Sequence, residues 1–283
     1  MFLSQVIPQE TGYSIAENIG RAIGRLSSAN QQRAVRANQW VVSCKKLSSR
    51  ELDRVTEAVF RFSGYMMYDF YHNINRPKVI LDKVLFSPSM ERFIKHDRYK
   101  SGYMIVVPHT GNFDLAGRAM ALRGLEFQVL SYPQPPGAYK VQNRLREVPG
   151  MEVTPMSHDS MRAAGKRMAD GGIVITGLDR PLAESNYHPR FFGLPAPLPV
   201  SYIRMAMKAN VPVIVAAAMR IAGGRYLLDA TEPIHMQPAD DLKTEMEHNA
   251  ETVLSRAEAF IRRAPQQWAM FYPVWPQVTP QVP

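Results

Sequence analysis

Cysteine is almost absent from this sequence of 283 residues, in which Cys44 stands alone. One cysteine cannot form an intramolecular disulfide, so the chain is not a small secreted disulfide scaffold, and a reducing compartment is expected. Several enzyme motifs are missing too, namely the G-x-S-x-G elbow, the P-loop, G-x-G-x-x-G and H-E-x-x-H. These absences argue against serine hydrolases, P-loop NTPases, dinucleotide-binding enzymes and zinc proteases.

Long apolar runs are also lacking. The longest, Val213–Met219, is far shorter than the roughly 20 residues of a transmembrane helix. Gln5, Pro8 and Glu10 interrupt the apolar start of the chain, so we expect no signal peptide. Hydrophobic residues nonetheless make up 46% and charged residues 21%, which excludes a disordered chain and allows a sizeable core. The composition favours a soluble or surface-bound protein of the cytoplasm.

Positive charge is present in excess and is unevenly placed. The formal net charge is +9, and residues 1–100 carry 16 basic against 9 acidic side chains, whereas the remainder carries 18 against 16. A basic first third indicates nucleic acid, an anionic membrane surface or merely a solvated face. No known nucleic-acid reader motif is present, so we favour the membrane surface and expect no nucleic acid as a partner.

The first hundred residues predict helices. Two capping boxes, Ser14-x-x-Glu17 and Ser48-x-x-Glu51, each precede an amphipathic pattern. The apolar side of the first helix comprises Ile15, Ile19, Ala22, Ile23 and Leu26, with Arg21 and Arg25 opposite. The second pattern is wide and rich in aromatic residues, which is typical of core packing, with a lining for a greasy ligand or a lipid-contacting face as the alternative.

From residue 101 the pattern changes to alternating strands and helices. Strands are expected over 103–108, 126–132, 151–155, 172–178, 211–219 and 225–232, and helices over 112–124, 138–147, 158–170, 200–209 and 241–263. This alternation predicts the α/β class, with a largely parallel central sheet flanked by helices and preceded by an N-terminal helical layer. Gly223-Gly224 predicts a hairpin onto an antiparallel neighbour. We expect one domain over 1–283, divided into a basic, membrane-facing helical layer (1–100), a catalytic α/β core (101–275) and a frayed proline-rich tail (276–283).

The candidate chemistry lies in the segment H-T-G-N-F-D, His109 to Asp114, directly after the first strand of this core. In open α/β sheets, ligands bind at the carboxyl ends of the strands. We expect Asp114, in the first turn of the following helix, to fold back on the imidazole and make His109 a general base. The N–H groups at the start of that helix suit a developing oxyanion. A second H-x-x-x-x-D pair, His235 and Asp240, is interrupted by a proline and is treated as noise.

Five sequence blocks resemble a known family. They are HTGNFD, GLDRPL followed by PRFFG, VPVIVAAAMR followed by GGRY, PQQWAMFYPVW, and a lead-in of RANQWVV and SSRELDRVTEAVFRFSG. In this order they resemble the bacterial lysophospholipid acyltransferase-like proteins of the lipid A late acyltransferase type, a group that includes mycobacterial phosphatidylinositol mannoside acyltransferase. The resemblance implies a glycerolipid acyltransferase-like fold and the transfer of a fatty acyl chain from acyl-CoA or acyl carrier protein to a hydroxyl of a lipid or glycolipid, with neither a metal nor a cofactor.

The resemblance also implies roles for particular residues. His109 would be the base and Asp114 its partner, and Arg146, with Arg144 as the near alternative, matches an arginine that assists some thirty residues after this pair. Gly111 and Asn112 are expected to contact substrate. Asp179 and Arg180 close another strand at the same edge of the sheet, where they contact the acceptor's head group or form a simple structural ion pair.

Some features depart from the family pattern. Phe113 stands where tryptophan is usual, and Val274-Trp275-Pro276 replaces a closing Arg-Trp-Lys. Without an N-terminal membrane helix, the resemblance favours an enzyme held peripherally on the inner face of the cell membrane by the basic layer and by Phe2, Leu3, Val6 and Ile7. The alternatives are a non-catalytic lipid-binding protein on the same fold and a thioesterase or esterase that uses the same pair.

Overall fold

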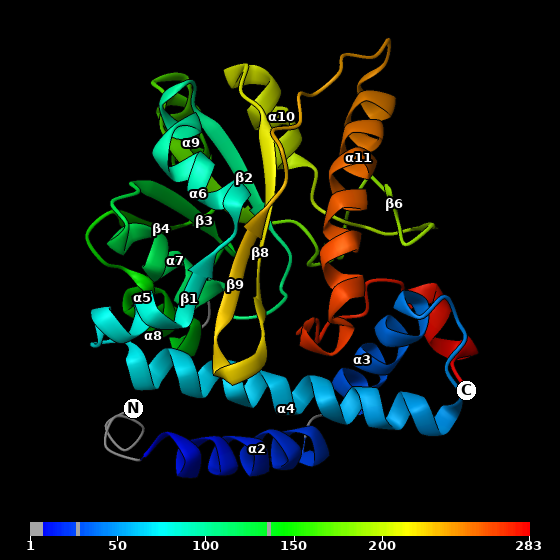
Figure 1. The fold of residues 1–283 in the computed structure, drawn as a ribbon. Helices are drawn as coiled ribbons and strands as arrows, with labels where there is room; N and C mark the ends of the chain where they lie inside the picture. The colour runs from blue at the N-terminus through cyan, green and yellow to red at the C-terminus, as the bar shows by residue number, and fades with distance from the viewer. Residues whose placement is uncertain (1–7, 27–28, 135–136) are drawn as a thin grey trace.

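A seven-stranded sheet forms the centre of the structure, a computed structural model that describes residues 8–26, 29–134 and 137–283 (Figure 1). The strand order is β1-β9-β8-β2-β5-β3-β4. Five strands are parallel to one another: β2 (Tyr103–Val107), β3 (Phe127–Ser131), β4 (Met151–Pro155), β5 (Ile173–Gly177) and β8 (Val213–Arg220). The predicted α/β class with a largely parallel sheet is confirmed.

One edge of the sheet runs in the opposite direction. The 3-10 turn η2 (Ala222–Gly224) leads β8 back into β9 (Tyr226–Ala230), which is antiparallel to β8 as Gly223-Gly224 predicted. Gly223 has a positive φ of 72°, which a glycine adopts without strain. The short β1 (Val84–Phe86), which the sequence did not reveal, pairs parallel with β9. A separate hairpin of β6 (Arg190–Phe191) and β7 (Leu194–Pro195) lies outside the sheet and was also not predicted.

Helices cover both faces of the sheet, each over its own hydrophobic core. On one face α5 (Pro77–Lys83), α6 (Pro88–Lys95) and α7 (Phe113–Leu122) contribute to a core with the odd-numbered positions of β2, such as Ile105. On the other face α9 (His158–Ala169), α10 (Ser201–Ala209) and α11 (Leu242–Arg263) pack against the even-numbered positions, such as Met104 and Val106. The strands are buried on both sides because helices cover both faces, as in other parallel sheets. The helix α8 (Gly137–Arg146) links β3 to β4.

The N-terminal layer lies across one end of the sheet. It consists of α2 (Gln9–Leu26), α3 (Ala29–Val42) and α4 (Ser49–Asn73). Figure 1 shows α4 running under the end at which β8 turns into β9, with α2 along its outer side. Because β2, β3, β4 and β5 are parallel to β8, this is the end that holds their carboxyl termini. The capping box at Ser48 and Glu51 is confirmed at the start of α4.

The first helix differs from the prediction. It begins at Gln9, so Ser14 lies inside the helix and does not cap it. The described members of its predicted apolar side do not pack against the core, since Ile15 is 40% and Ile19 50% exposed and Ala22 is exposed as well. The side chains of Ile23, Arg25 and Leu26, and the whole of residues 1–7 with Phe2, Leu3, Val6 and Ile7, lie outside the described part of the chain.

The C-terminal tail is ordered, which corrects the expected frayed end at 276–283. Pro276–Gln281 forms the 3-10 helix η4, and Val278 is buried against the core under α3. Proline at the first position of a 3-10 or α-helical turn costs little, because its missing N–H would have no partner there. The carbonyl oxygen of Pro283 accepts a hydrogen bond from Arg36 on α3 at 2.6 Å. Proline content alone therefore misled the prediction.

Candidate active site

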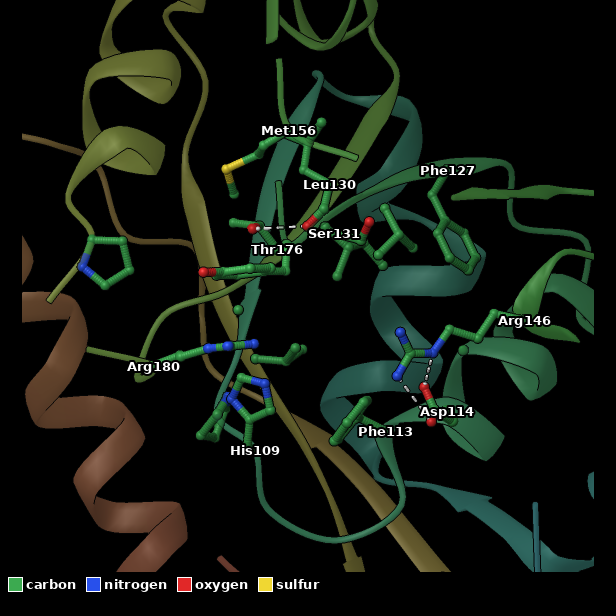
Figure 2. Close-up of a pocket in the computed structure, with 18 of the residues that line it drawn as sticks. His109, Phe113, Asp114, Phe127, Leu130, Ser131, Arg146, Met156, Thr176 and Arg180 are labelled. Atoms are coloured by element: carbon green, nitrogen blue, oxygen red, sulfur yellow. Dashed lines mark hydrogen bonds and ion pairs between the residues drawn. The ribbon is translucent and has the colours of Figure 1, made fainter. Parts of the chain in front are cut away.

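The candidate site lies at the carboxyl ends of β2, β5 and β3, where a cavity of about 500 Å³ opens (Figure 2). His109, Asp114, Arg146 and Arg180 all line it. Most of the other lining side chains are apolar and come from both faces of the sheet and from α7; among them are Met120, Phe127, Val129, Leu130, Met151, Met156, Met161, Ile175 and Leu182. The size and the largely apolar wall suit a small or lipidic ligand.

The imidazole of His109 is held by Asp179. Nδ1 of His109 donates to Oδ1 of Asp179 at 2.6 Å, and the backbone N–H of His109 donates to Oδ2 at 2.8 Å. Asp179 is fully buried, and the indole N–H of Trp268 donates to the same Oδ2 at 2.7 Å. A carboxylate at Nδ1 places the proton of the neutral ring on that nitrogen and leaves the Nε2 lone pair available. Among the residues that the structure describes, none forms a hydrogen bond with Nε2.

The expected pairing of His109 with Asp114 is therefore wrong. Oδ1 of Asp114 accepts from Nε of Arg146 at 2.6 Å, and Oδ2 accepts from Nη2 of Arg146 and from Gln142, each at 3.2 Å. The ring of Phe113 lies between the two pairs, with its centroid 5.5 Å from that of His109 and 5.8 Å from the guanidinium carbon of Arg146 (Figure 2). Asp114 is at the start of α7, and its side chain points toward α8 and not back toward the histidine.

Arg146 is where the sequence placed it, on the wall of the site, but its charge is satisfied. It is buried, and Nη1 donates to Oδ1 of Asn143 at 3.0 Å and to the hydroxyl of Tyr139 at 3.3 Å. Burial alone would disfavour the guanidinium, but the Asp114 carboxylate outweighs it and raises the pKa of Arg146 above its ordinary value. The Asp114–Arg146 pair is thus a fixed element of the cavity wall. Arg144, the alternative, is exposed on α8 and does not line the cavity.

Gly111 and Asn112 shape the turn after His109. Gly111 has a φ of 61°, and a Cβ there would clash with the carbonyl oxygen of Ala218, so the turn requires glycine. Asn112 is the N-cap of α7: its side-chain oxygen accepts from Leu115 N at 3.1 Å, and its amide donates to the carbonyl of Met66 on α4 at 3.0 Å. These contacts are with the protein itself and fix His109 relative to α7 and α4.

Arg118, one turn after Asp114 on α7, ties two helix ends together. It is 9% exposed, and its guanidinium donates to Leu145 O at the end of α8 at 2.9 Å and to Ile74 O at the end of α4 at 2.6 Å. Burial lowers its pKa below the ordinary value. Among the described residues no carboxylate pairs with it, so the negative ends of two helix dipoles and their free carbonyls stabilise this buried cation.

Arg180 lies at the cavity beside the catalytic candidate, because it follows Asp179 in the chain. Its guanidinium carbon is 3.9 Å from the ring centroid of Tyr132 and 4.2 Å from that of Tyr272, whose hydroxyl accepts a hydrogen bond at 2.9 Å. Asp179 and Arg180 therefore have different partners. The Asp179 carboxylate bonds to His109, and the Arg180 guanidinium is stacked between the rings of Tyr132 and Tyr272. The suggested ion pair between these neighbours is not formed.

The cavity has no donor set for a metal. Within residues 8–26, 29–134 and 137–283, no group of three or more His, Cys, Asp or Glu side chains comes together. The arrangement instead suits proton transfer, with an oriented imidazole whose Nε2 can accept a proton and a buried carboxylate to stabilise the imidazolium. None of the described helices combines the length and hydropathy that a membrane crossing requires.

Trp268 is the site residue that the sequence analysis missed, and Asp179 is the one whose role it assigned differently. Trp268 belongs to the block PQQWAMFYPVW, which was read only as part of a resemblance. Its backbone also bridges to Thr110, next to the histidine. The register of the sheet is the signal that could have found Asp179: Val107 pairs with Gly177, so His109 and Asp179, each two residues later, come level on neighbouring strands.

Comparisons with known proteins identify the family of the chain. The chain is similar to phosphatidylinositol mannoside acyltransferase from two strains of Mycobacterium tuberculosis, with 26% identity over 117 residues in each case. The similar stretch covers 40% of this chain and only 37% of either mycobacterial protein. The family model of the bacterial lipid A biosynthesis acyltransferases matches residues 1–277. With nearly its whole length matched, the chain belongs to the bacterial lipid A biosynthesis acyltransferase family.

Proposed function

We propose that this protein transfers a fatty acyl chain from a thioester, acyl-CoA or acyl carrier protein, to a hydroxyl group of a lipid or glycolipid at a membrane surface. The observation that carries the proposal is the His109–Asp179 pair at an apolar cavity of about 500 Å³. Family membership supports acyl transfer, and the cavity wall supports a fatty chain as the group transferred.

In the proposed reaction His109 is the general base. Nε2 takes the proton of the acceptor hydroxyl while its oxygen attacks the thioester carbonyl carbon, and the resulting imidazolium is stabilised by Asp179 at Nδ1. When the C–S bond breaks, the proton passes from Nε2 to the leaving thiolate, so the histidine returns to its neutral form. No covalent acyl-enzyme is needed, because the thioester is already activated.

The ion pair on the other side of Phe113 has a second role in this proposal. Asp114 and Arg146 are held together by two hydrogen bonds, on the opposite side of the Phe113 ring from His109. We assign Asp114 and Arg146 to orienting the substrates. The guanidinium of Arg146 would also stabilise the negative charge that develops on the carbonyl oxygen of the thioester. Arg180, held between two tyrosine rings, is assigned to binding the polar head group of the acceptor. Arg144, which is exposed on α8, is assigned to contacting the anionic membrane surface.

The acyl chain is assigned to the part of the cavity between α7 and the sheet. Gly117 and Met120 on α7 face Phe127, Val129 and Met151 there. A Cβ at Gly117 would come within 3.2 Å of the Met151 side chain, so the glycine keeps this space open. Methionine side chains are flexible enough to adapt to the end of a fatty chain.

The decisive experiment compares His109→Ala and Asp179→Asn with the wild type and with His248→Ala, a control on the exposed side of α11. We expect both site variants to lose transfer by about 100- to 10,000-fold, as removal of general-base catalysis does, with little change in Tm for His109→Ala. Purified protein is assayed with labelled acyl-CoA and acyl carrier protein against a panel of lysolipids and glycolipids. Wild-type turnover in a folded His109→Ala variant would contradict the mechanism.

The same assay separates the two alternatives. Release of free fatty acid by the wild type, without an acylated product, would identify a thioesterase in which water replaces the acceptor hydroxyl. Stoichiometric binding of acyl-CoA without turnover in any combination of donor and acceptor would identify a non-catalytic lipid-binding protein. The proposed location is peripheral, on the inner face of the cell membrane, and it is supported by the basic first hundred residues.

A further inference from the structure

The helix α2 packs against α4 through Gly12, Ala16 and Gly20, and it leaves Ile15 and Ile19 40% and 50% exposed. We propose that the exposed apolar row formed by Ile15 and Ile19 of α2 and Met67 of α4 inserts into the interfacial region of an anionic lipid bilayer and docks the candidate active site on it. The inference deepens the proposed function, on which it rests for the presence of a lipid substrate, by naming the docking element.

Close contacts between the backbones of α2 and α4 determine which side of α2 packs against α4. Gly12, Ala16 and Gly20 follow one another at four-residue spacing along the side of α2 that faces α4. A Cβ at Gly20 would lie 2.8 Å from the carbonyl oxygen of Phe60, and one at Gly64 of α4 would clash with the carbonyl oxygen of Ala16. Rotating α2 to bury an isoleucine would drive its larger side chain into these contacts. The exposed isoleucines are therefore a built feature of the helix pair.

Polar contacts hold the other flank of the pair. Glu17 accepts from Tyr65 at 2.5 Å and from Arg21 at 2.6 Å, and it lies 3.7 Å from Arg61. These contacts leave Ile15 and Ile19 on the opposite flank, where they are 40% and 50% exposed. Soluble proteins often expose single apolar residues. An amphipathic helix with aliphatic residues on one side and charged residues on the other is typical of helices that lie in the membrane interface.

The row continues onto α4. Gly12 lies against Tyr68 and Gly64 against Ala16, so the two helices are antiparallel and Met67 comes level with the first half of α2. Met67 is 52% exposed. Its neighbour Met66 accepts the hydrogen bond from Asn112 that anchors the turn after His109. The apolar row is thus one contact away from the candidate active site and lies at the same end of the sheet (Figure 1).

A bilayer fits this row better than a second copy of the chain. Three separate side chains on a convex helix pair are far fewer than the 20 to 30 residues a side that a standard protein interface uses. A lipid surface needs no complementary shape. Charge favours it as well, since the net charge is +9, and Arg50 and Arg54 on α4 are exposed.

The test measures binding to vesicles of phosphatidylglycerol and phosphatidylcholine by flotation, with no catalytic readout. We expect Ile15→Gln/Ile19→Gln to reduce the partition of the protein onto these vesicles by about tenfold or more, because two aliphatic side chains no longer enter the interface. The matched control is Leu242→Gln, an aliphatic residue 52% exposed at the start of α11, which lies at the end of the sheet away from α2 and α4 (Figure 1). The control should bind as the wild type does.

A second measurement keeps the inference testable if the double variant is unstable. Cys44 is the only cysteine, and it is exposed. In a Cys44→Ser background, an environment-sensitive dye on Ile19→Cys should shift to the blue when vesicles are added, whereas the same dye on Leu242→Cys should not. Transfer to a water-soluble short-chain acceptor should be unchanged in Ile15→Gln/Ile19→Gln, which separates docking from the chemistry at His109.

Three results would overturn the inference. Unchanged vesicle binding of the double variant would mean that the basic residues alone hold the protein. Equal dye shifts at positions 19 and 242 would mean that the row is not the contact. A monomer formed by the double variant from a wild-type dimer would assign the row to a second copy. Each of these can occur while His109→Ala abolishes transfer, so the proposed function is judged independently.

Discussion

At the scale of single residues, the two carboxylates of the candidate site have different partners, Asp179 at the imidazole of His109 and Asp114 at the guanidinium of Arg146. The H-x-x-x-x-D pattern was expected to fold Asp114 back on His109, yet Asp114 is held by Arg146, 32 residues further on. Asp179 lies 70 residues from His109 and reaches it only because β2 and β5 are neighbours in register. A strand partner 70 residues away is set by sheet topology, which local periodicity does not contain.

Trp268 carries the prediction that belongs to this scale. Its indole N–H is one of the donors that stabilise the buried Asp179 carboxylate, and hydrogen bonds to charged groups contribute about 1.5–3 kcal/mol. We expect Trp268→Phe, which keeps an aromatic ring, to lower kcat by about tenfold or more, with less effect on KM. The kinetic constants are measured with one donor and one acceptor.

The control for this prediction is Trp275→Phe. Trp275 is equally buried, and its indole N–H donates at 3.4 Å to the carbonyl of Leu194, away from His109. If both variants lost the same activity together with the same Tm, Trp268 would be a packing residue and not a support of Asp179.

At the scale of elements, most of the fold could be predicted, because helix and strand periods alternate clearly after residue 101. The central strands and the helices α7 to α11 lie within a few residues of their predicted bounds. The exceptions have physical reasons. The strands β1, β6 and β7 have two or three residues each, too few to show a period. The packed side of α2 was hidden because a close helix contact selects glycine and alanine, which carry almost no hydrophobic signal.

Arg118 gives the prediction at this scale, since it couples α7 to the ends of α4 and α8. Removing the guanidinium in Arg118→Met leaves the carbonyls of Leu145 and Ile74 without their donors and frees α8, which carries Arg146. We expect kcat to fall by about tenfold through the displaced Asp114–Arg146 pair, and Arg118→Lys to restore part of it. The measurement is a double-mutant cycle with Arg146→Met.

The cycle distinguishes positioning from general stability. If Arg118 acts through Arg146, its substitution costs little activity once Arg146 is already methionine, because coupled residues are not additive. Equal losses in both backgrounds, or a loss that follows Tm alone, would show that Arg118 only stabilises the fold.

At the scale of the whole molecule, the C-terminal segment packs back onto the N-terminal helical layer. The N-terminal layer covers the carboxyl end of the sheet, and the tail returns to it, so that η4 packs on α3 near the marked C-terminus (Figure 1). Asn38 on α3 donates to the carbonyls of Met270 and Tyr272, and it accepts from Val274 N. The segment that supplies Trp268 and Tyr272 to the site is therefore held in place from the N-terminal layer.

A substitution at Val278 tests whether the tail contributes to the core. It is 2% exposed and belongs to the core shared by α3, α10 and α11. Deleting two buried methyl groups in Val278→Ala removes their transfer free energy and leaves a cavity, at a cost of about 1.5–3 kcal/mol of unfolding free energy. Gln281→Ala, an exposed change in the same turn, should leave stability within about 0.5 kcal/mol of the wild type. Both are measured by urea unfolding. A Val278→Ala variant as stable as Gln281→Ala would mean that the tail lies on the surface without contributing to the core. The tail would then not help the N-terminal layer to hold Trp268 beside Asp179.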